Sequence, residues 1–373
     1  MLIGIPKEIK VHEYRVGLTP MGVKELARQG HRILVQKSAG AGIGFSDADY
    51  RVAGAELAES ANDIYQQAEM IMKVKEPQAQ ECAMLRPGQL LFAYLHLAAD
   101  RPQTDALIQS GCTAIAFETV TASGGGLPLL APMSEVAGRM SIQAGAHCLE
   151  KAQGGRGVLL GGVPGVLPAK VVVIGGGVVG ENAARMAIGL GADVTIIDRS
   201  IPRLKQLDAQ FGGRVRTLYS TQENLETAVL AADLVVGAVL IPGAAAPKLV
   251  TREMVRAMQA GSVLVDVAID QGGCFETSHA TTHSDPIYNV NEVVHYCVAN
   301  MPGAVARTSA QALENATLPY AQALADKGWL QALRDDHHLA NGLNVHAGQI
   351  TCGGVAAAFD LPLIPMEQVL NAG

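Results

Sequence analysis

A glycine-rich segment near the middle of the chain constrains the fold more than any other stretch. Gly175-x-Gly177-x-x-Gly180 follows a run of β-branched residues and opens an alanine-rich helical pattern. In such a turn the first glycine permits the tight bend, the second lets the backbone approach a pyrophosphate, and the third lets helix and strand pack closely. Unpaired N–H groups at the start of the helix favour the anion. The segment therefore predicts a Rossmann unit that binds a dinucleotide.

An acidic residue closes the second predicted strand of this unit. Asp198 follows the apolar run 194–197. A carboxylate at this position accepts hydrogen bonds from the adenosine ribose and repels a 2′-phosphate. We therefore expect NAD in preference to NADP. Arg199 and Arg203 lie nearby and leave NADP open, because an arginine accommodates the 2′-phosphate.

The composition limits the class of protein. A length of 373 residues suffices for two domains, and a net charge of −7 gives no electrostatic footprint for nucleic acid or anionic lipid. The chain has no uninterrupted apolar stretch of about 18 residues, and its N-terminus does not resemble a signal peptide. Six scattered cysteines without a CxxC pair are typical of buried thiols. We expect a cytoplasmic enzyme with neither a membrane nor a nucleic-acid partner.

The part of the chain before the Rossmann unit also alternates strands with helices. This alternation predicts a second doubly wound domain. Two long helical patterns bracket the Rossmann unit, one beginning near Pro132 and the other running from about Ala304 to Ala325. We therefore expect an α/β protein with two doubly wound Rossmann-like domains joined by two long helices, the first domain being discontinuous. The expected domains are residues 1–131 with 305–373, for substrate and catalysis, and residues 132–304, for NAD.

Four polar residues follow predicted strands, at the edge where open parallel sheets bind ligands. They are Arg15 after Leu2–Ile5, Lys75 after Met70–Val74, His96 after Leu90–Leu95 and Asp270 after Val263–Ile269. An arginine holds a carboxylate with a bidentate fork, a lysine polarises a developing carbonyl, and a histidine moves protons near neutral pH. The set predicts amino-acid redox chemistry, in which Asp270 orients the nicotinamide ribose or acts as a second acid or base.

Each of these residues also has a structural alternative. Arg15 could form a surface ion pair, Lys75 could lie in a solvated loop, and His96 on its apolar run could be a satisfied core histidine. His279 and His283 have i, i+4 spacing, which suggests a metal site. Their segment has no helix signal and no neighbouring ligands, so we expect no metal.

Longer motifs resemble those of the L-alanine dehydrogenase family along nearly the whole chain. The opening IGIPKEIKVHEYRVGLTP is also similar to the NAD(H)-binding part of proton-translocating transhydrogenases, whereas VKEP, YLHLA, PMSEVAGRMS, IDQGGCFETS and VANMPGAV look like alanine dehydrogenase alone. The resemblance implies reversible, NAD-dependent oxidative deamination of L-alanine to pyruvate and ammonium by a homohexamer. It implies that Arg15 and Lys75 bind the substrate, and that His96, Asp270 and Lys75 are catalytic.

The resemblance further implies NAD contacts near the helix start at Pro132 and at the ends of the Rossmann strands. They are Ser134, Gly175, Gly177, Val178, Val179, Gly180, Asp198, Arg203, Ser220, Val239, Leu240, Val267, Ala268, Ile269, Asp270, Val298, Ala299, Asn300 and Met301. At His279 several relatives have arginine, so a phosphate contact is not carried over to this position. Leu130 and Met133 are candidates either for an apolar wall around the alanine methyl group or for ordinary packing.

Two other functions stay open at this point. The chain could be a soluble NAD(H)-binding subunit of a transhydrogenase, although YLHLA and VANMPGAV weigh against it. It could also be a non-catalytic NAD-binding regulator, which would not need four polar groups beside the nicotinamide.

Overall fold

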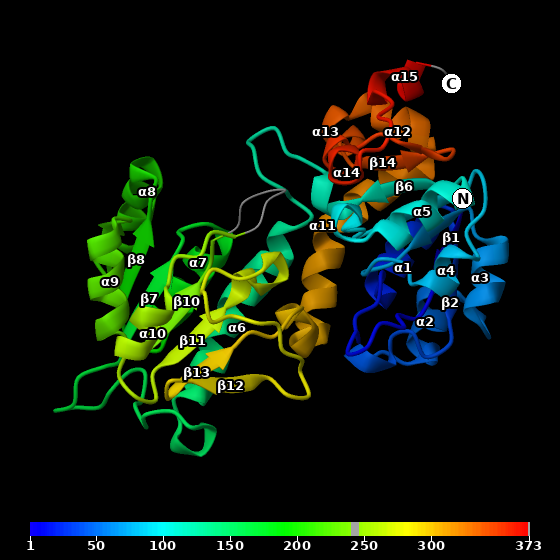
Figure 1. The fold of residues 1–373 in the computed structure, drawn as a ribbon. Helices are drawn as coiled ribbons and strands as arrows, with labels where there is room; N and C mark the ends of the chain where they lie inside the picture. The colour runs from blue at the N-terminus through cyan, green and yellow to red at the C-terminus, as the bar shows by residue number, and fades with distance from the viewer. Residues whose placement is uncertain (240–245, 372–373) are drawn as a thin grey trace. The chain divides into compact units, whose positions relative to one another are not determined.

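The computed structural model describes residues 1–239 and 246–371, which form two compact α/β units. Unit 1 consists of Met1–Met133 and Val305–Gly373, and unit 2 of Ser134–Ala304. The chain leaves unit 1 along the long helix α6 (Ala131–Cys148) and re-enters it through a 3-10 turn (Met301–Val305) that leads into the long helix α11 (Ala306–Lys327). The predicted fold class is confirmed, including the discontinuous first unit and the two long helices (Figure 1).

The sheet of unit 1 is wound outward from its centre in both directions. Among the described residues its order is β15-β14-β6-β5-β4-β1-β2-β3, and the six strands from β6 to β3 are parallel. The chain moves from β1 to β3 and then crosses to β4 on the other side of β1, so the switch point lies between β1 and β4. The strands are β1 (Leu2–Ile5), β2 (Arg32–Gln36), β3 (Glu56–Ala58), β4 (Met70–Met72), β5 (Leu90–Ala93), β6 (Thr113–Ala116) and the antiparallel β14 (Leu343–His346) and β15 (Gln349–Ile350).

Two predicted strands of unit 1 are too long. The predictions were 70–74 and 90–95, but β4 ends at Met72 and β5 at Ala93. Carboxylates explain the difference, because Glu8 accepts the N–H of Val74 at 2.7 Å and Glu118 accepts the N–H of Leu95 at 3.2 Å. These side chains satisfy backbone donors in the positions that follow the two strands.

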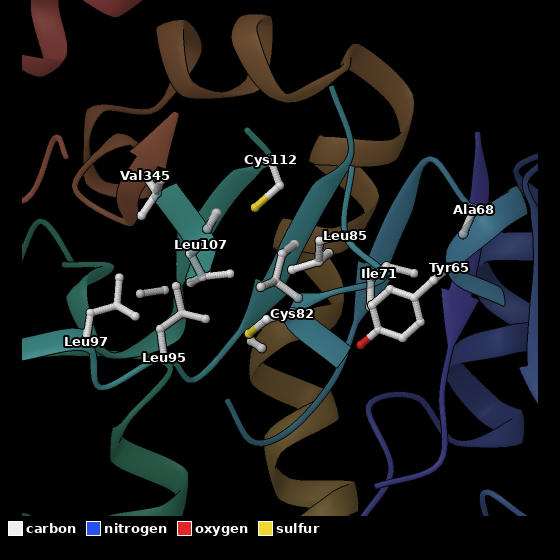
Figure 2. Close-up of a cluster of buried hydrophobic side chains, with 14 of the residues drawn as sticks. Tyr65, Ala68, Ile71, Cys82, Leu85, Leu95, Leu97, Leu107, Cys112 and Val345 are labelled. Carbon is white, nitrogen blue, oxygen red and sulfur yellow. The ribbon is translucent and has the colours of Figure 1, made fainter. Parts of the chain in front are cut away.

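The helices of unit 1 cover its sheet. The Thr19-Pro20 pair predicts the start of a helix and Gly30 its end. In the structure Thr19 caps α1 by accepting the N–H of Met21, and Gly30 has φ +88 just beyond the helix. One face of the sheet packs a buried cluster that includes Tyr65, Cys82 and Leu107 (Figure 2). The helices are α1 (Pro20–Arg28), α2 (Asp47–Ala53), α3 (Ala61–Gln67), α4 (Ala79–Cys82), α5 (Arg101–Ser110), α11, α12 (Trp329–Asp335), α13 (His337–Ala340), α14 (Gly353–Phe359) and α15 (Met366–Asn371).

Unit 2 repeats this winding. Among the described residues its order is β12-β13-β11-β10-β7-β8-β9, with the switch point between β7 and β10. The strands are β7 (Lys170–Ile174), β8 (Asp193–Asp198), β9 (Val215–Tyr219), β10 (Leu234–Gly237), β11 (Val263–Asp266), β12 (Ile287–Val290) and β13 (Val293–Tyr296), and the helices are α6, α7 (Val178–Gly189), α8 (Ile201–Phe211), α9 (Gln222–Ala231) and α10 (Arg252–Ala257). No helix within the described ranges combines the length and apolarity needed to cross a bilayer.

The last strands of unit 2 differ from the prediction. The runs at 263–269 and 296–299 predict strands, but β11 ends at Asp266 and β13 at Tyr296, and the partner strand β12 has no predicted counterpart. β12 is a partly exposed antiparallel edge strand, so it lacks the continuous apolar run that marks a buried parallel strand. The end of β13 still leads into Val298–Met301.

Candidate active site

Among the glycines of the glycine-rich turn of unit 2, one has free space where a side chain would be. A Cβ on Gly180 would lie 1.8 Å from the carbonyl oxygen of Gly175, and a Cβ on Gly175, whose φ is +100, would lie 2.6 Å from that of Ala238. These two glycines are therefore required by packing. A Cβ on Gly177 would meet nothing within 4 Å. Gly177 is the N-cap residue of α7 and provides no side-chain cap, so the turn fits an anion at a bare helix N-terminus.

The end of β8 is tied to this turn by Asp198. Its carboxylate accepts the N–H of Gly176 at 2.6 Å and that of Ser200 at 2.7 Å. Arg203 contacts the same turn, because its Nε donates to the carbonyl of Gly176 at 2.6 Å. Its Nη2 donates to Glu181 at 2.6 Å, which reduces the positive charge available to a 2′-phosphate.

Glu181 is a residue that the sequence analysis missed. Burial alone would raise the pKa of this carboxyl, but hydrogen bonds from Gln210, Arg203 and Arg185 lower it. Glu181 therefore stays ionised beside the glycine-rich turn, one helical turn into α7.

The other predicted cofactor residues come directly after the parallel strands of unit 2, and Figure 1 shows how these strands are arranged. They are Ser220 after β9, Val239 after β10, Val267, Ala268, Ile269 and Asp270 in a 3-10 turn after β11, and Val298, Ala299, Asn300 and Met301 after β13. Ser134 lies in the first turn of α6, one turn before Gly138, whose Cβ would lie 2.2 Å from the carbonyl oxygen of Val179 in the first turn of α7. Leu240 lies outside the described residues. The described members of the set thus gather at one edge of this sheet and at the start of α7.

His279 and His283 make separate contacts. The His279 ring stacks on Tyr288 with a centroid separation of 3.7 Å. The Nε2 atom of His283 lies 3.1 Å from the carbonyl oxygen of Asn300. Among the described residues no group of three or more metal-ligating side chains is found.

In unit 1, Arg15, Lys75 and His96 follow the neighbouring parallel strands β1, β4 and β5. They therefore lie at one edge of the sheet, next to its switch point. The loop after β1 is held against the end of β4, because a Cβ on Gly17 would lie 2.5 Å from the carbonyl oxygen of Met72. Asp270 belongs to unit 2.

Arg15 is buried rather than on the surface. Its side chain is 2% exposed, and its Nε and Nη2 atoms donate to the two carboxylate oxygens of Glu13 at 2.7 and 2.5 Å. Its Nη1 atom lies 3.0 Å from the sulfur of Met133. Burial alone would lower the pKa of Arg15, but Glu13 outweighs it and raises the pKa. Glu13, which the sequence analysis missed, thus keeps a charged guanidinium oriented in the protein interior.

His96 is not a core histidine. Its side chain is 46% exposed, and its backbone is left-handed, with φ 52. The N–H of His96 donates to Glu118 at 2.6 Å, and its Nδ1 atom lies 4.0 Å from the same carboxylate oxygen. Its ring lies parallel to that of Tyr94, 5.8 Å away and with an interplanar angle of 9°. The imidazole is therefore both accessible and held in place.

Tyr94 lies between Arg15 and His96. The sequence analysis missed this residue as well. Its hydroxyl donates to the carbonyl of Leu129 at 2.5 Å. Burial raises the pKa of Tyr94, and the charge of nearby Arg15 offsets only part of the shift. A neutral phenol thus lies close to the guanidinium and stacks on the imidazole of His96.

The two lysines of the KVK run have different environments. Lys73 is fully buried, with its Nζ atom 2.7 Å from Glu8 and 3.3 Å from Glu81. The side chain of Lys75 is 15% exposed, with its Nζ atom 3.8 Å from Glu76. The second oxygen of Glu8 accepts the N–H groups of Val74 and Lys75. Lys75 is therefore not in a solvated loop, and it is the lysine of the pair with access to a ligand.

Comparison with known proteins places both units in one family. The model described as alanine dehydrogenase/PNT, N-terminal domain, matches residues 4–137, and the corresponding C-terminal domain model matches residues 141–353. The alanine dehydrogenase of Halomonas elongata is 65% identical over 371 residues, which cover 100% of each chain.

Two solved structures are similar over most of their length. An L-alanine dehydrogenase is 55% identical with a TM-score of 0.94, covering 96% of this chain and 99% of that one. A transhydrogenase from Sinorhizobium meliloti is 26% identical with a TM-score of 0.81, covering 95% and 99%. The resemblance read from the sequence is confirmed: this chain belongs to the alanine dehydrogenase/PNT family of oxidoreductases.

Proposed function

We propose that the chain catalyses the reversible oxidative deamination of L-alanine to pyruvate and ammonium, with NAD as the hydride acceptor. The observation that carries this proposal is the 65% identity with an alanine dehydrogenase over the whole of both chains. The geometry supports it, because unit 1 holds an oriented guanidinium, an ammonium and an imidazole at one sheet edge. A site for an amino acid and a 2-oxo acid requires such groups to bind the substrate carboxylate and to move protons.

NAD would be held by unit 2. Bound NAD would supply the acceptor for the hydride of the substrate Cα. Gly177 and the N-terminus of α7 would hold the pyrophosphate, and Asp198 the adenosine ribose. The ion pair between Arg203 and Glu181 supports NAD over NADP. Asp198→Ala should narrow the preference for NAD, mainly by weakening NAD, and equal efficiency of the unaltered enzyme with NADP would contradict this assignment.

The substrate would be held by unit 1. Arg15, oriented by Glu13, would bind the carboxylate with paired donors. Lys75 would share that carboxylate and stabilise the oxygen that forms as water adds to the imine. Met133, in contact with Arg15, is a candidate for the wall around the alanine methyl group.

His96 would move the protons of imine hydration and of carbinolamine collapse, with Asp270 as the second acid or base. An exposed imidazole suits this role, because it must exchange protons with the reacting groups and with water. Tyr94 and Glu118 would keep the ring and backbone of His96 in place.

The domain roles and the assembly are part of the same proposal. Residues 1–131 with 305–373 would form the substrate domain, and residues 132–304 the NAD domain. The division of the chain into two compact units at nearby positions supports these boundaries. Membership of the family supports a homohexamer, which light scattering or analytical ultracentrifugation would test.

The alternative is an NAD(H)-binding subunit of a transhydrogenase. Its support is weaker, because the similar transhydrogenase is 26% identical whereas the alanine dehydrogenases are at 55–65%. A panel of amino acids and 2-oxo acids, assayed with NAD and NADH, separates the two functions. We expect alanine-dependent NADH formation and pyruvate-dependent NADH oxidation that requires ammonium. Absence of both activities would refute the proposal.

A further inference from the structure

The single turn that carries Asp270 is bound at one end by a lysine. The turn is the 3-10 segment Val267–Gln271, and the carbonyl oxygens of Gly272, Gly273 and Phe275 follow it. The Nζ atom of Lys248 lies 2.5, 2.8 and 3.2 Å from these three oxygens. An ammonium has three donors and no acceptor, so the three carbonyls saturate it.

At its other end the turn is bound by a buried carboxylate. Asp266 is 0% exposed, and its Oδ1 atom accepts the N–H of Ala268 at 3.1 Å. Its Oδ2 atom accepts the N–H of Cys274 at 2.9 Å and the hydroxyl of Ser278 at 2.5 Å. Asp266 thereby joins the start of the turn to the loop beyond it.

The turn needs such support, because one 3-10 turn has few internal hydrogen bonds. Its exit is also conformationally demanding, since Gly272 and Gly273 have φ +88 and +76. A Cβ on Gly273 would lie 2.6 Å from the carboxylate of Asp266. The backbone of this segment therefore packs closely against the carboxylate of Asp266 and accepts hydrogen bonds from the ammonium of Lys248.

We propose that Lys248 is a positioning residue that, opposite Asp266, fixes the backbone of the Asp270 turn. Asp270 lies within this turn and its side chain is exposed, so the position of the backbone sets the region that its carboxylate can reach. The catalytic consequence rests on the proposed function of Asp270 as an acid or base. The three hydrogen bonds of Lys248 all go to backbone carbonyl oxygens, so we assign it a positioning role and no step of the reaction.

The variant Lys248→Met removes the three donors and keeps an unbranched side chain. Lys205→Met is the matched control, because Lys205 is an exposed lysine of α8 outside both sites. We expect faster hydrogen–deuterium exchange in the amides of residues 267–276 of Lys248→Met, and an exchange rate in this segment unchanged in the control. Unchanged exchange in Lys248→Met would overturn the inference, whether or not Asp270 is catalytic.

Kinetics then test the connection with Asp270. We expect Lys248→Met to lower kcat about tenfold, since small misplacements of a reacting group cost up to about a hundredfold. In an Asp270→Asn background the same substitution should have little further effect on kcat. Full additivity of the two substitutions would overturn the proposed path through Asp270. An Asp270→Asn variant with normal kcat would refute the proposed role of Asp270, while faster exchange would still support Lys248 as the residue that fixes the turn.

Discussion

The parallel strands of the two units have the same topology, but different chemical groups lie at the switch point of each sheet. In unit 1 the parallel strands run β3-β2-β1-β4-β5-β6, and in unit 2 the corresponding order is β9-β8-β7-β10-β11-β13. At the switch point of unit 1 lie paired charges, including Arg15 with Glu13 and Lys73 with Glu8. At that of unit 2 lies a glycine turn that presents backbone groups. The same winding thus carries two different sets of groups at the places where we propose that substrate and cofactor bind.

This difference between charged side chains in unit 1 and backbone groups in unit 2 matches the ligands that we propose for the two units. A small carboxylate is recognised by a few charged donors, and these must be buried and paired to hold one orientation. A pyrophosphate is recognised by backbone N–H groups at a helix start, which requires that side chains be absent. Unit 1 should therefore be sensitive to the identity of its side chains, and unit 2 to any added side-chain atom.

The largest effect is expected from the exposed imidazole of unit 1. His96→Ala should lower kcat by about 100- to 10,000-fold, the usual contribution of a general acid or base. NADH binding should survive, because the substitution leaves unit 2 intact. His147→Gln, at an exposed site on α6, serves as the control. Turnover within a few-fold of the unaltered enzyme would remove His96 from the mechanism.

A smaller effect is expected from the guanidinium. Arg15→Lys keeps the charge but loses the paired donors, so KM for alanine and for pyruvate should rise about 10- to 150-fold, from a loss of about 1.5–3 kcal/mol. Steady-state kinetics provide the measurement, and Arg28→Lys at an exposed site is the control. An unchanged KM for both substrates would make Arg15 purely structural.

In unit 2 we expect a single added methyl group to weaken cofactor binding. Gly177→Ala adds a Cβ that meets no protein atom within 4 Å, so the fold should be preserved. The methyl group would enter the space proposed for the pyrophosphate, and we expect NADH to bind about tenfold more weakly, a change of about 1.4 kcal/mol. Gly189→Ala, equally free of contacts but at the far end of α7, should leave NADH binding unchanged.

The last expected effect concerns the stability of unit 2 and not its activity. His295 in unit 2 is 0% exposed, and its Nδ1 and Nε2 atoms hydrogen-bond with Val293 and Thr277. Burial lowers its pKa to about 4 from 6.5. Protonation of His295 therefore favours the unfolded chain. The contribution of the neutral ring to the free energy of unfolding is fully present above pH 6.5, and it is lost as the pH falls towards 4.

At pH 4 the free energy of unfolding should be lower by about 3 kcal/mol because of the protonation of His295. Urea unfolding followed from pH 7 to pH 4 measures it, and His295→Gln should flatten the profile relative to the unaltered protein. His147→Gln should retain the original slope. An equally steep profile for His295→Gln would show that other groups cause the acid sensitivity.

The sequence alone was sufficient for features that depend on local pattern. The glycine turn, the cap at Thr19 and the alternation of strands and helices all have short-range signals, and the structure agrees with each. The strand ends were predicted less well, since Glu8 contacts Val74 across 66 residues of sequence. Such long-range contacts leave no local pattern.

Site residues were missed for two reasons. Glu118 contacts His96 across 22 residues of sequence. Glu13 and Tyr94 lie two residues before Arg15 and His96, in motifs whose chemistry was assigned to those two residues alone. The exposure of His96 was also unpredictable, because its left-handed backbone rotates the side chain out of an otherwise apolar run. Lys248 and Asp266 come from different parts of the sequence and both bind residues 272–275.

The most direct test of the contrast between the units is a crossed measurement on two variants. Arg15→Lys and Gly177→Ala would each be examined for the KM of alanine at saturating NAD and for NADH affinity by fluorescence titration. We predict that Arg15→Lys raises the alanine KM and leaves NADH affinity nearly unchanged, while Gly177→Ala weakens NADH binding and leaves that KM nearly unchanged. If both variants lose NADH binding equally, or if Arg15→Lys leaves the alanine KM untouched, the proposed division between a side-chain substrate site and a backbone cofactor site is wrong.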